Sequence, residues 1–166
     1  YGGITSFMRR RYSRDLSGVD VAVLGVPFDL ATTNRAGTRL GPRGIRTASA
    51  SLSWENQVQG WDFSPLEELA IVDYGDCPFD AGTPDKVPEQ IYQQARDILA
   101  TDTALLSLGG DHFVSYPLLR AHAEKYGPLA LIHFDAHSDT WEDDGPRIDH
   151  GTMFYHAAKE GLVVPE

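Results

Sequence analysis

Four apolar runs rich in β-branched residues recur along this chain, and they constrain its fold more than any other feature. They cover residues 19–28, 69–73, 103–108 and 129–134. Short apolar runs of this kind are typical of strands that are buried on both faces. Because the segments between the runs are long enough to form helices, strand and helix alternate along the chain. That alternation predicts a parallel sheet with helices on both of its faces.

Three of the intervening segments carry helix signals. A helix is predicted over residues 42–54, which open with a proline, a residue that the first turn of a helix tolerates. A second is predicted over residues 87–100, with one apolar face formed by Ile91, Ala95, Ile98 and Leu99. A third, over residues 116–125, ends just before a glycine and a proline. Since no repeat or interdomain linker interrupts the pattern, residues 1–166 are predicted to form a single α/β domain.

Size and charge narrow the class of protein. The chain has 166 residues, of which 42% are hydrophobic, as is ordinary for a globular domain. Its net charge of −10 disfavours nucleic acid or an anionic membrane as a partner. The single cysteine, Cys77, cannot form an internal disulfide, and no signal peptide or transmembrane segment is apparent. We therefore expect a cytoplasmic protein that binds neither nucleic acid nor membrane.

The segment that follows the last apolar run places three metal-capable side chains at alternate positions. Asp135, His137 and Asp139 occupy these positions. Alternate residues of an extended strand point to one face, so we expect the three to converge on one point and to bind metal. A polar turn, capped by the two aspartates and with His137 in solvent, is the alternative interpretation. His133 is expected to face away from the motif as a buried, hydrogen-bonded core residue.

A further histidine follows the preceding apolar run. Gly109 and Gly110 allow the backbone to turn tightly and to approach another segment closely. His112 then lies at the carboxyl end of its strand, where open α/β sheets bind ligands. Carboxylate and imidazole donors without cysteine suit Mn²⁺ better than a structural Zn²⁺. His122 and His156 lie on predicted helical segments and are expected to be structural.

Motifs for two other chemistries are absent from the sequence. Neither the G-x-G-x-x-G pattern nor a Walker-type loop occurs, which removes the main support for nucleotide binding. The G-x-S-x-G turn of serine hydrolases is also absent. A metal-dependent reaction is therefore the interpretation that the motifs favour.

Taken together, the motifs resemble those of the ureohydrolases, the family of arginase and agmatinase, and most closely the bacterial agmatinases. The segments that carry the resemblance are GVPFD at 25–29, RAGTRLGP at 35–42, GGDHFVS at 109–115, HFDAHSDT at 133–140 and DHGTMF at 149–154. The resemblance implies an arginase-like, three-layer α/β/α fold with a mostly parallel sheet. The family's third metal motif, roughly S-x-D-x-D-x-x-D-P, has no match here. We therefore expect this chain to be the amino-terminal portion of a longer enzyme, with an incomplete sheet and no activity by itself.

The resemblance also implies roles for individual residues. His112, Asp135 and Asp139 would bind one manganese ion, and Asp135 would bridge to a second ion held by His137. A pair of such ions can lower the pKa of a shared water from about 15.7 to near 7. His150 would be the catalytic proton shuttle, with a surface loop histidine as the alternative.

The loop between the predicted metal centre and His150 is expected to border the substrate pocket. Residues 140–149 contain four carboxylates, which favour a substrate that ends in a cationic amine. The candidate substrate-binding residues are Trp141, Glu142, Asp144 and Arg147. Arg147 could pair with the carboxylate of 4-guanidinobutyrate or neutralise a neighbouring acid. Trp141 could line the channel or anchor the loop.

The predicted function is manganese-dependent hydrolysis of agmatine to putrescine and urea. The family resemblance implies a homo-oligomer, a trimer or a hexamer. Within the same chemistry, a guanidinobutyrase or related guanidino-acid hydrolase is the alternative. Outside it, the chain could be a non-catalytic fragment or subunit, or a deacetylase-like metallohydrolase with a single zinc ion.

Overall fold

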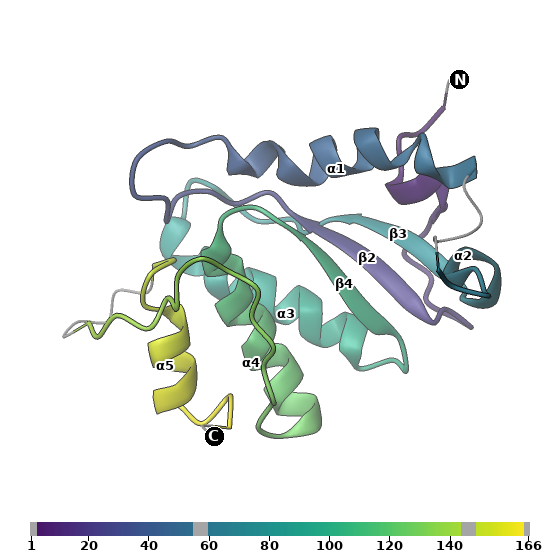
Figure 1. Ribbon diagram of the computed structural model, residues 1–166. Helices are drawn as coiled ribbons and strands as arrows, with labels where there is room; N and C mark the ends of the chain where they lie inside the picture. The colour runs from purple at the N-terminus through teal and green to yellow at the C-terminus, as the bar shows by residue number, and fades with distance from the viewer. Residues whose placement is uncertain (1–2, 55–59, 144–148, 165–166) are drawn as a thin grey trace.

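A parallel sheet with strand order β1-β3-β2-β4 forms the centre of the computed structural model, which describes residues 3–54, 60–143 and 149–164 (Figure 1). Its strands are β1 (Arg11–Tyr12), β2 (Val21–Val26), β3 (Ile71–Asp76) and β4 (Ala104–Gly109). The predicted strands at 19–28, 69–73 and 103–108 are confirmed, with bounds that differ by a few residues. The short β1 was not predicted.

Helices cover both faces of the sheet, so the three-layer α/β/α architecture is confirmed (Figure 1). Helix α1 (Gly41–Ser49) lies on one face, and α3 (Val87–Leu99) and α4 (Ser115–Tyr126) lie on the other. Helix α5 (Met153–Lys159) packs against α4, and the single turn α2 (Pro65–Glu68) leads into β3. Short 3-10 turns complete the described chain: η1 (Phe7–Arg9), η2 (Thr38–Leu40), η3 (Leu52–Trp54), η4 (Pro84–Lys86) and η5 (His112–Val114). Within the described ranges, no helix has the length and apolarity to cross a membrane.

The apolar core lies between β2 and the helices α3, α4 and α5. Leu24 and Val26 of β2 are fully buried, as are all four residues of the predicted apolar face of α3: Ile91, Ala95, Ile98 and Leu99. Each large aliphatic side chain buried in this way stabilises the fold by about 1.5–3 kcal/mol. The apolar face predicted for the helix at residues 87–100 is therefore confirmed.

The strand register aligns the carboxyl ends of β2, β3 and β4 at one edge of the sheet. Val26 pairs with Gly109, and Gly25 pairs with Asp76. The loops that follow these strands therefore leave the sheet side by side. This edge receives the loop after β2 and the turn that carries His112.

The predicted strand at residues 129–134 is wrong. Only Leu129 pairs, in an isolated parallel bridge with Val163, and residues 130–134 have no regular structure. A strand requires backbone partners, and within the described residues no strand lies beside this segment to supply them. Consequently Ile132 and Phe134 are 82% and 95% exposed.

A buried ion pair joins α1 to β3. Arg46 donates from Nε and Nη2 to the two oxygens of Asp73, at 2.7 and 2.9 Å, and from Nη1 to Asp76 Oδ1. The side chains of Arg46 and Asp73 are only 9% and 2% exposed. Asp73 also accepts from the backbone N–H of Phe7 at 2.7 Å, so it fixes the amino-terminal segment as well.

Replacing Asp73 by asparagine should lower the free energy of unfolding by about 3 kcal/mol, because it leaves the guanidinium of Arg46 buried without its main counter-charge. Urea unfolding of the protein expressed in full from its gene measures the effect. Asp97→Asn is the control, because Asp97 and its partner Arg96 are 62% and 43% exposed. That control should lose less than about 1 kcal/mol. Equal losses in the two variants would contradict the importance of the buried pair.

Candidate metal centre

The glycine turn after β4 lies directly against the end of β2. Gly110 has a φ of +52°, and a Cβ at this position would lie 2.3 Å from the carbonyl oxygen of Val26. Only glycine fits there, so the close approach predicted for this turn is confirmed. The backbone N–H of Asp111 then donates to the carbonyl of Phe28 at 2.7 Å. These contacts fix the turn that presents His112.

The carboxylate of Asp111 joins this turn to the loop after β2. One oxygen accepts from the N–H of Phe113 and the other from the N–H of Ala31, both at 3.0 Å. Asp111 is 3% exposed, and burial raises the pKa of its carboxyl although both hydrogen bonds oppose the rise. Asp111 is therefore structural and does not point into the cavity.

The loop after β2 is closed upon itself by Asp29. Its Oδ2 accepts from the N–H of Gly37 at 2.6 Å and from Nε of Arg39 at 2.9 Å, and its Oδ1 pairs with the Arg39 guanidinium. Hydrogen bonds from the Arg39 side chain and from backbone N–H groups lower the pKa of Asp29 to about 2. The loop is thus held at both ends, with Thr33 between them.

A cavity of about 620 Å³ opens between this loop and the segment that follows residue 134. Its lining residues are Thr33, His112, Asp135, His137, Ser138, Asp139, Trp141, Asp149, His150 and Gly151. The four predicted metal ligands, the predicted shuttle and one predicted substrate residue are therefore brought together.

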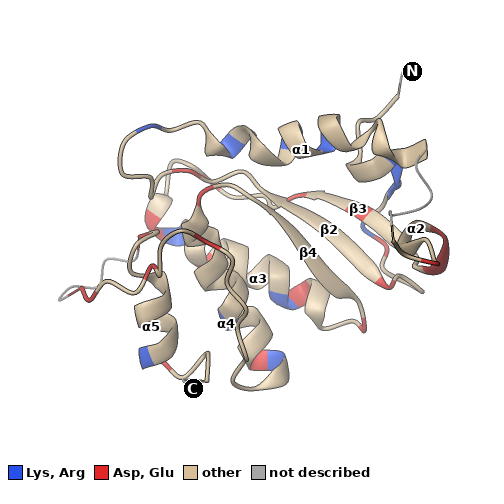
Figure 2. Ribbon diagram, viewed as in Figure 1, with Lys and Arg blue, Asp and Glu red and all other residues tan. Residues whose placement is uncertain are grey.

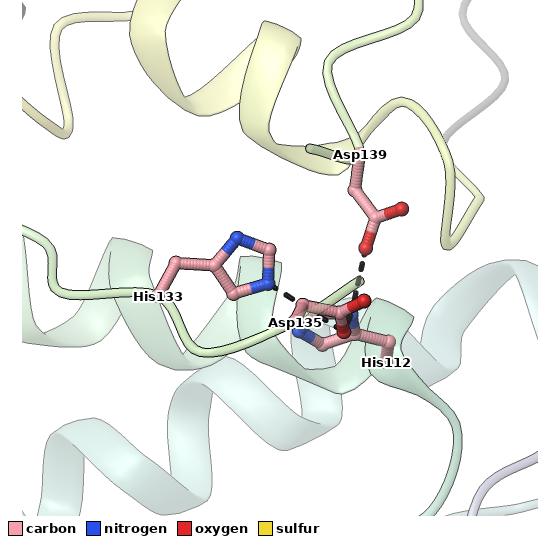
Figure 3. Close-up of side chains that lie close together, drawn as sticks. All are labelled: His112, His133, Asp135 and Asp139. Atoms are coloured by element: carbon pink, nitrogen blue, oxygen red, sulfur yellow. Dashed lines mark ion pairs between the residues drawn. The ribbon is translucent and has the colours of Figure 1, made fainter. Parts of the chain in front are cut away.

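Four metal-capable side chains, those of His112, His133, Asp135 and Asp139, lie close together (Figure 3). His112 Nδ1 lies 2.7 Å from Asp139 Oδ2 and 3.5 Å from Asp135 Oδ2. Ligand atoms of His112, His133, Asp135 and Asp139 all lie within 4.8 Å of one another. Such separations suit donors that share one cation, so three of the predicted ligands meet as expected.

Asp135 presents its two oxygens to two different histidines. Oδ2 faces His112, whereas Oδ1 lies 3.4 Å from Nδ1 of His137 and accepts from the His137 backbone N–H at 2.9 Å. That backbone hydrogen bond, aided by the nearby imidazoles, lowers the pKa of Asp135. The two oxygens of this carboxylate are thus directed toward different imidazoles.

The convergence has a different cause from the one predicted. Residues 135–137 form a bend, not an extended strand, and Asp139 has a left-handed φ of +50°. Aspartate tolerates this conformation better than most residues, and strained backbone of this kind clusters at functional sites. The bend leaves the side chain of His137 81% exposed.

The prediction that His133 faces away from the motif is wrong. Its Nε2 lies 3.6 Å from Asp135 Oδ2, and its ring packs against Phe154 at 4.7 Å between centroids. Alternation, applied consistently, would have grouped residue 133 with residues 135, 137 and 139. Its Nε2 is buried without a hydrogen-bond partner among the described residues, contrary to the expectation of a satisfied core histidine.

His150 also lines the cavity and contacts Thr33. His150 Nε2 and Thr33 Oγ1 are hydrogen-bonded at 2.7 Å. The sequence interpretation assigned no role to Thr33. Its position after β2, at the edge where parallel strands of such sheets bind ligands, was the signal that could have found it.

The predicted substrate residues divide into three groups. Trp141 lines the cavity. Its backbone N–H donates to the carbonyl of Gly151 at 3.0 Å, and this hydrogen bond anchors the loop. Glu142 accepts from the Tyr155 hydroxyl at 3.0 Å and is not among the lining residues of the cavity. Asp144 and Arg147 lie outside the described residues.

The donor set suits a hard or intermediate divalent cation. Its described members are carboxylate oxygens and imidazole nitrogens, and the one cysteine, Cys77, is buried in the apolar core and does not line the cavity. Oxygen and nitrogen donors of this kind are typical of hard or intermediate divalent metals. The Oδ2 side of Asp135, with His112 and Asp139, offers a first position, and the Oδ1 side, with His137, offers a second.

Comparisons with known proteins agree with this geometry. A family model described as the Arginase family matches residues 19–166. The agmatinase of Chromobacterium violaceum is 60% identical over 168 residues, which cover all of this chain and 52% of that protein. The crystal structure of a hypothetical agmatinase from Burkholderia thailandensis has a TM-score of 0.94 at 58% identity, covering 99% of this chain and 52% of that one. Proclavaminate amidino hydrolase from Streptomyces clavuligerus has a TM-score of 0.85 at 36% identity, covering 98% and 54%. The chain thus spans about half the length of these relatives.

Asp29 should make the stability of the protein depend on acid pH. Because its pKa is about 2 in the folded state and near 3.9 in unfolded chains, its contribution is present above about pH 4 and lost as the pH falls toward 2. Asp29→Asn should therefore cost about 2 kcal/mol at pH 7 and little at pH 2. Urea unfolding across this range measures the difference from the wild type. A cost that stays constant with pH would contradict the role of Asp29.

Proposed function

Since this chain belongs to the arginase family and matches the amino-terminal half of a bacterial agmatinase, we propose that it supplies the metal centre of a guanidino hydrolase. The proposed reaction is the manganese-dependent hydrolysis of agmatine to putrescine and urea. The observation that carries the proposal is the orientation of Asp135, whose two oxygens face two separate sets of donors. A carboxylate in this position is what a two-metal hydrolase needs to hold its ions together.

The roles of the residues follow from their positions. His112, Asp139 and the Oδ2 side of Asp135 would hold one ion, and His137 with the Oδ1 side would hold the other. When bound, a pair of divalent ions supplies Lewis acidity and lowers the pKa of a shared water to near 7. The left-handed backbone at Asp139 and the hydrogen bond within the bend orient the two carboxylates.

His150 is placed to move a proton to the leaving amine. Hydrolysis of a guanidinium breaks one C–N bond, and the departing nitrogen must gain a proton to leave as an amine. An imidazole can carry that proton near neutral pH. The hydrogen bond between Thr33 Oγ1 and His150 Nε2 holds the ring in the wall of the cavity.

The charge of the cavity supports a cationic substrate. Figure 2 shows acidic residues on the loops at the carboxyl ends of the strands. The described lining includes Asp135, Asp139 and Asp149 and contains no lysine or arginine. Bound metal ions would offset the charges of Asp135 and Asp139, so the support for a cationic substrate comes from Asp149 and from the absence of lysine and arginine in the described lining. The relatives named agmatinase support the same substrate class.

Guanidinobutyrase is the second candidate, because Arg147, which lies between Trp141 and His150 in the sequence, could pair with a substrate carboxylate. Urea release from agmatine and from 4-guanidinobutyrate, measured side by side with Mn²⁺ and the protein expressed in full from its gene, separates the two. We expect the higher kcat/KM with agmatine. Preference for 4-guanidinobutyrate would replace agmatine in this proposal, and urea from neither substrate would reject the proposal itself.

Replacing Asp135 by alanine should abolish urea release and remove manganese, because one side chain serves both metal positions. Metal content by atomic emission, together with the urea assay, measures both effects. Asp97→Asn removes one negative charge far from the cavity and should leave metal content and turnover unchanged. Two bound manganese ions in the Asp135→Ala variant would contradict the bridging role.

Replacing His150 by asparagine should lower kcat by about 10²–10⁴-fold and leave metal content intact, because the residue moves a proton and is not a ligand. Steady-state kinetics and metal analysis of the same preparation test this. His122→Asn is a matched control, because His122 lies on α4 and bonds the carbonyl of Leu118 at 2.8 Å. Loss of manganese from the His150 variant would make His150 a ligand and end the shuttle assignment.

A further inference from the structure

We propose that His133 is a positioning residue of the metal centre, which holds the Asp135 carboxylate by donating a hydrogen bond from Nε2 to Oδ2. This inference rests on the proposed function, in that Asp135 is taken to bind metal. The two atoms lie 3.6 Å apart, slightly beyond a hydrogen bond, so a small movement of either side chain closes the contact (Figure 3).

The first argument is that His133 Nε2 has no other partner. The atom is buried, and among the described residues it makes no hydrogen bond. Buried polar atoms in folded proteins are almost always paired, and a lone one calls for an explanation in terms of function or of a missing ligand. The group that His133 Nε2 faces is the carboxylate of Asp135, so the orphaned atom points into the metal centre.

The second argument is that the imidazole of His133 is already fixed in place. Its ring meets the edge of Phe154 at 4.7 Å and lies 5.2 Å from the ring of His112. The side chain is 23% exposed. Phe154 belongs to α5, and its backbone N–H donates to the carbonyl of Asp139 at 3.2 Å. Helix α5 therefore holds both the His133 ring and the Asp139 backbone.

The third argument is that Asp135 needs a partner on its Oδ2 side. The backbone N–H of His137 fixes Oδ1, whereas the donors near Oδ2 are the imidazoles of His112 and His133. His112 is itself 2.7 Å from Asp139 and is assigned to the first metal position. His133 is thus the group left to orient Oδ2. Residues that orient metal ligands in this way typically change metal affinity by 10- to 100-fold.

The test measures manganese affinity without substrate, on the metal-free protein expressed in full from its gene. His133→Phe keeps a ring against Phe154 but lacks the N–H, and His133→Gln restores a donor near the same position. Titration calorimetry should give a dissociation constant for manganese that is 10- to 100-fold larger in the phenylalanine variant than in the wild type. In the glutamine variant the value should be close to that of the wild type. His122→Phe, on α4, is the control and should bind manganese as the wild type does.

Thermal unfolding of the metal-free variants separates positioning from simple packing. Since Nε2 makes no hydrogen bond among the described residues, His133→Phe should keep the wild-type melting temperature or raise it, although it binds manganese more weakly. A lower melting temperature with unchanged affinity would overturn the inference, and so would equal affinity in all variants. If the phenylalanine variant does not fold, His133→Met, which also lacks the N–H, takes its place.

Two further outcomes are distinguishable. Nitrogen couplings in the electron spin echo of bound Mn²⁺ should be the same in wild type and in the glutamine variant, because the proposed role of His133 is to donate a hydrogen bond to Asp135 and not to bind the ion. Loss of one coupling on substitution would make His133 a direct ligand and overturn the positioning role. If the wild type itself bound no manganese, the proposed function would fail. If it bound manganese and released urea while His133→Phe behaved normally, only this inference would fail.

Discussion

The close contact between the glycine turn after β4 and the end of β2 is the constraint on which the rest of the site depends. Gly110 has no room for a side chain beside Val26, and Asp111 hydrogen-bonds to the backbone on both sides of this contact. His112 follows the turn on one side of this contact, and the loop with Thr33 follows β2 on the other side. Two parts of the cavity wall that are far apart in sequence are therefore held together by hydrogen bonds to the backbone.

This contact determines which segments contribute side chains to the cavity. Carboxylates and imidazoles that would hold metal come from the turn after β4 and from the bend at residues 135–139, whereas His150 is hydrogen-bonded to Thr33. Asp135 stands between two donor sets, and its own conformation is fixed by the backbone of His137. A site arranged in this way has its charges oriented in advance, so little reorganisation is needed when ligands bind.

Much of the fold was predictable because local sequence determines it. The apolar runs became β2, β3 and β4, of which β2 is the most completely buried, and the apolar face of α3 follows helical spacing. The segment at residues 129–134 has an equally good pattern but lacks a neighbouring strand among the described residues, and pairing is a property of partners that a single segment does not encode. Strand propensity alone therefore gave the wrong result there.

The candidate site was predictable to a similar degree and for a related reason. Asp135, His137 and Asp139 are recognisable from spacing, and the structure brings them near His112. The bend and the left-handed Asp139 that produce the convergence leave no clear trace in the sequence. Thr33 was missed because its contact with His150 joins residues 117 positions apart, whereas His133, two positions from Asp135, was missed because alternation was applied wrongly. Tertiary contacts of this length are set by the fold as a whole.

The central claim is that the two oxygens of Asp135 serve two metal positions. Its most direct test is anomalous diffraction at the manganese absorption edge, from crystals of the protein expressed in full and grown with Mn²⁺. The account predicts two peaks roughly 3.5–4 Å apart, one among His112, Asp139 and Asp135 Oδ2 and one beside His137 and Asp135 Oδ1. A single peak, or two peaks that do not share Asp135, would contradict it.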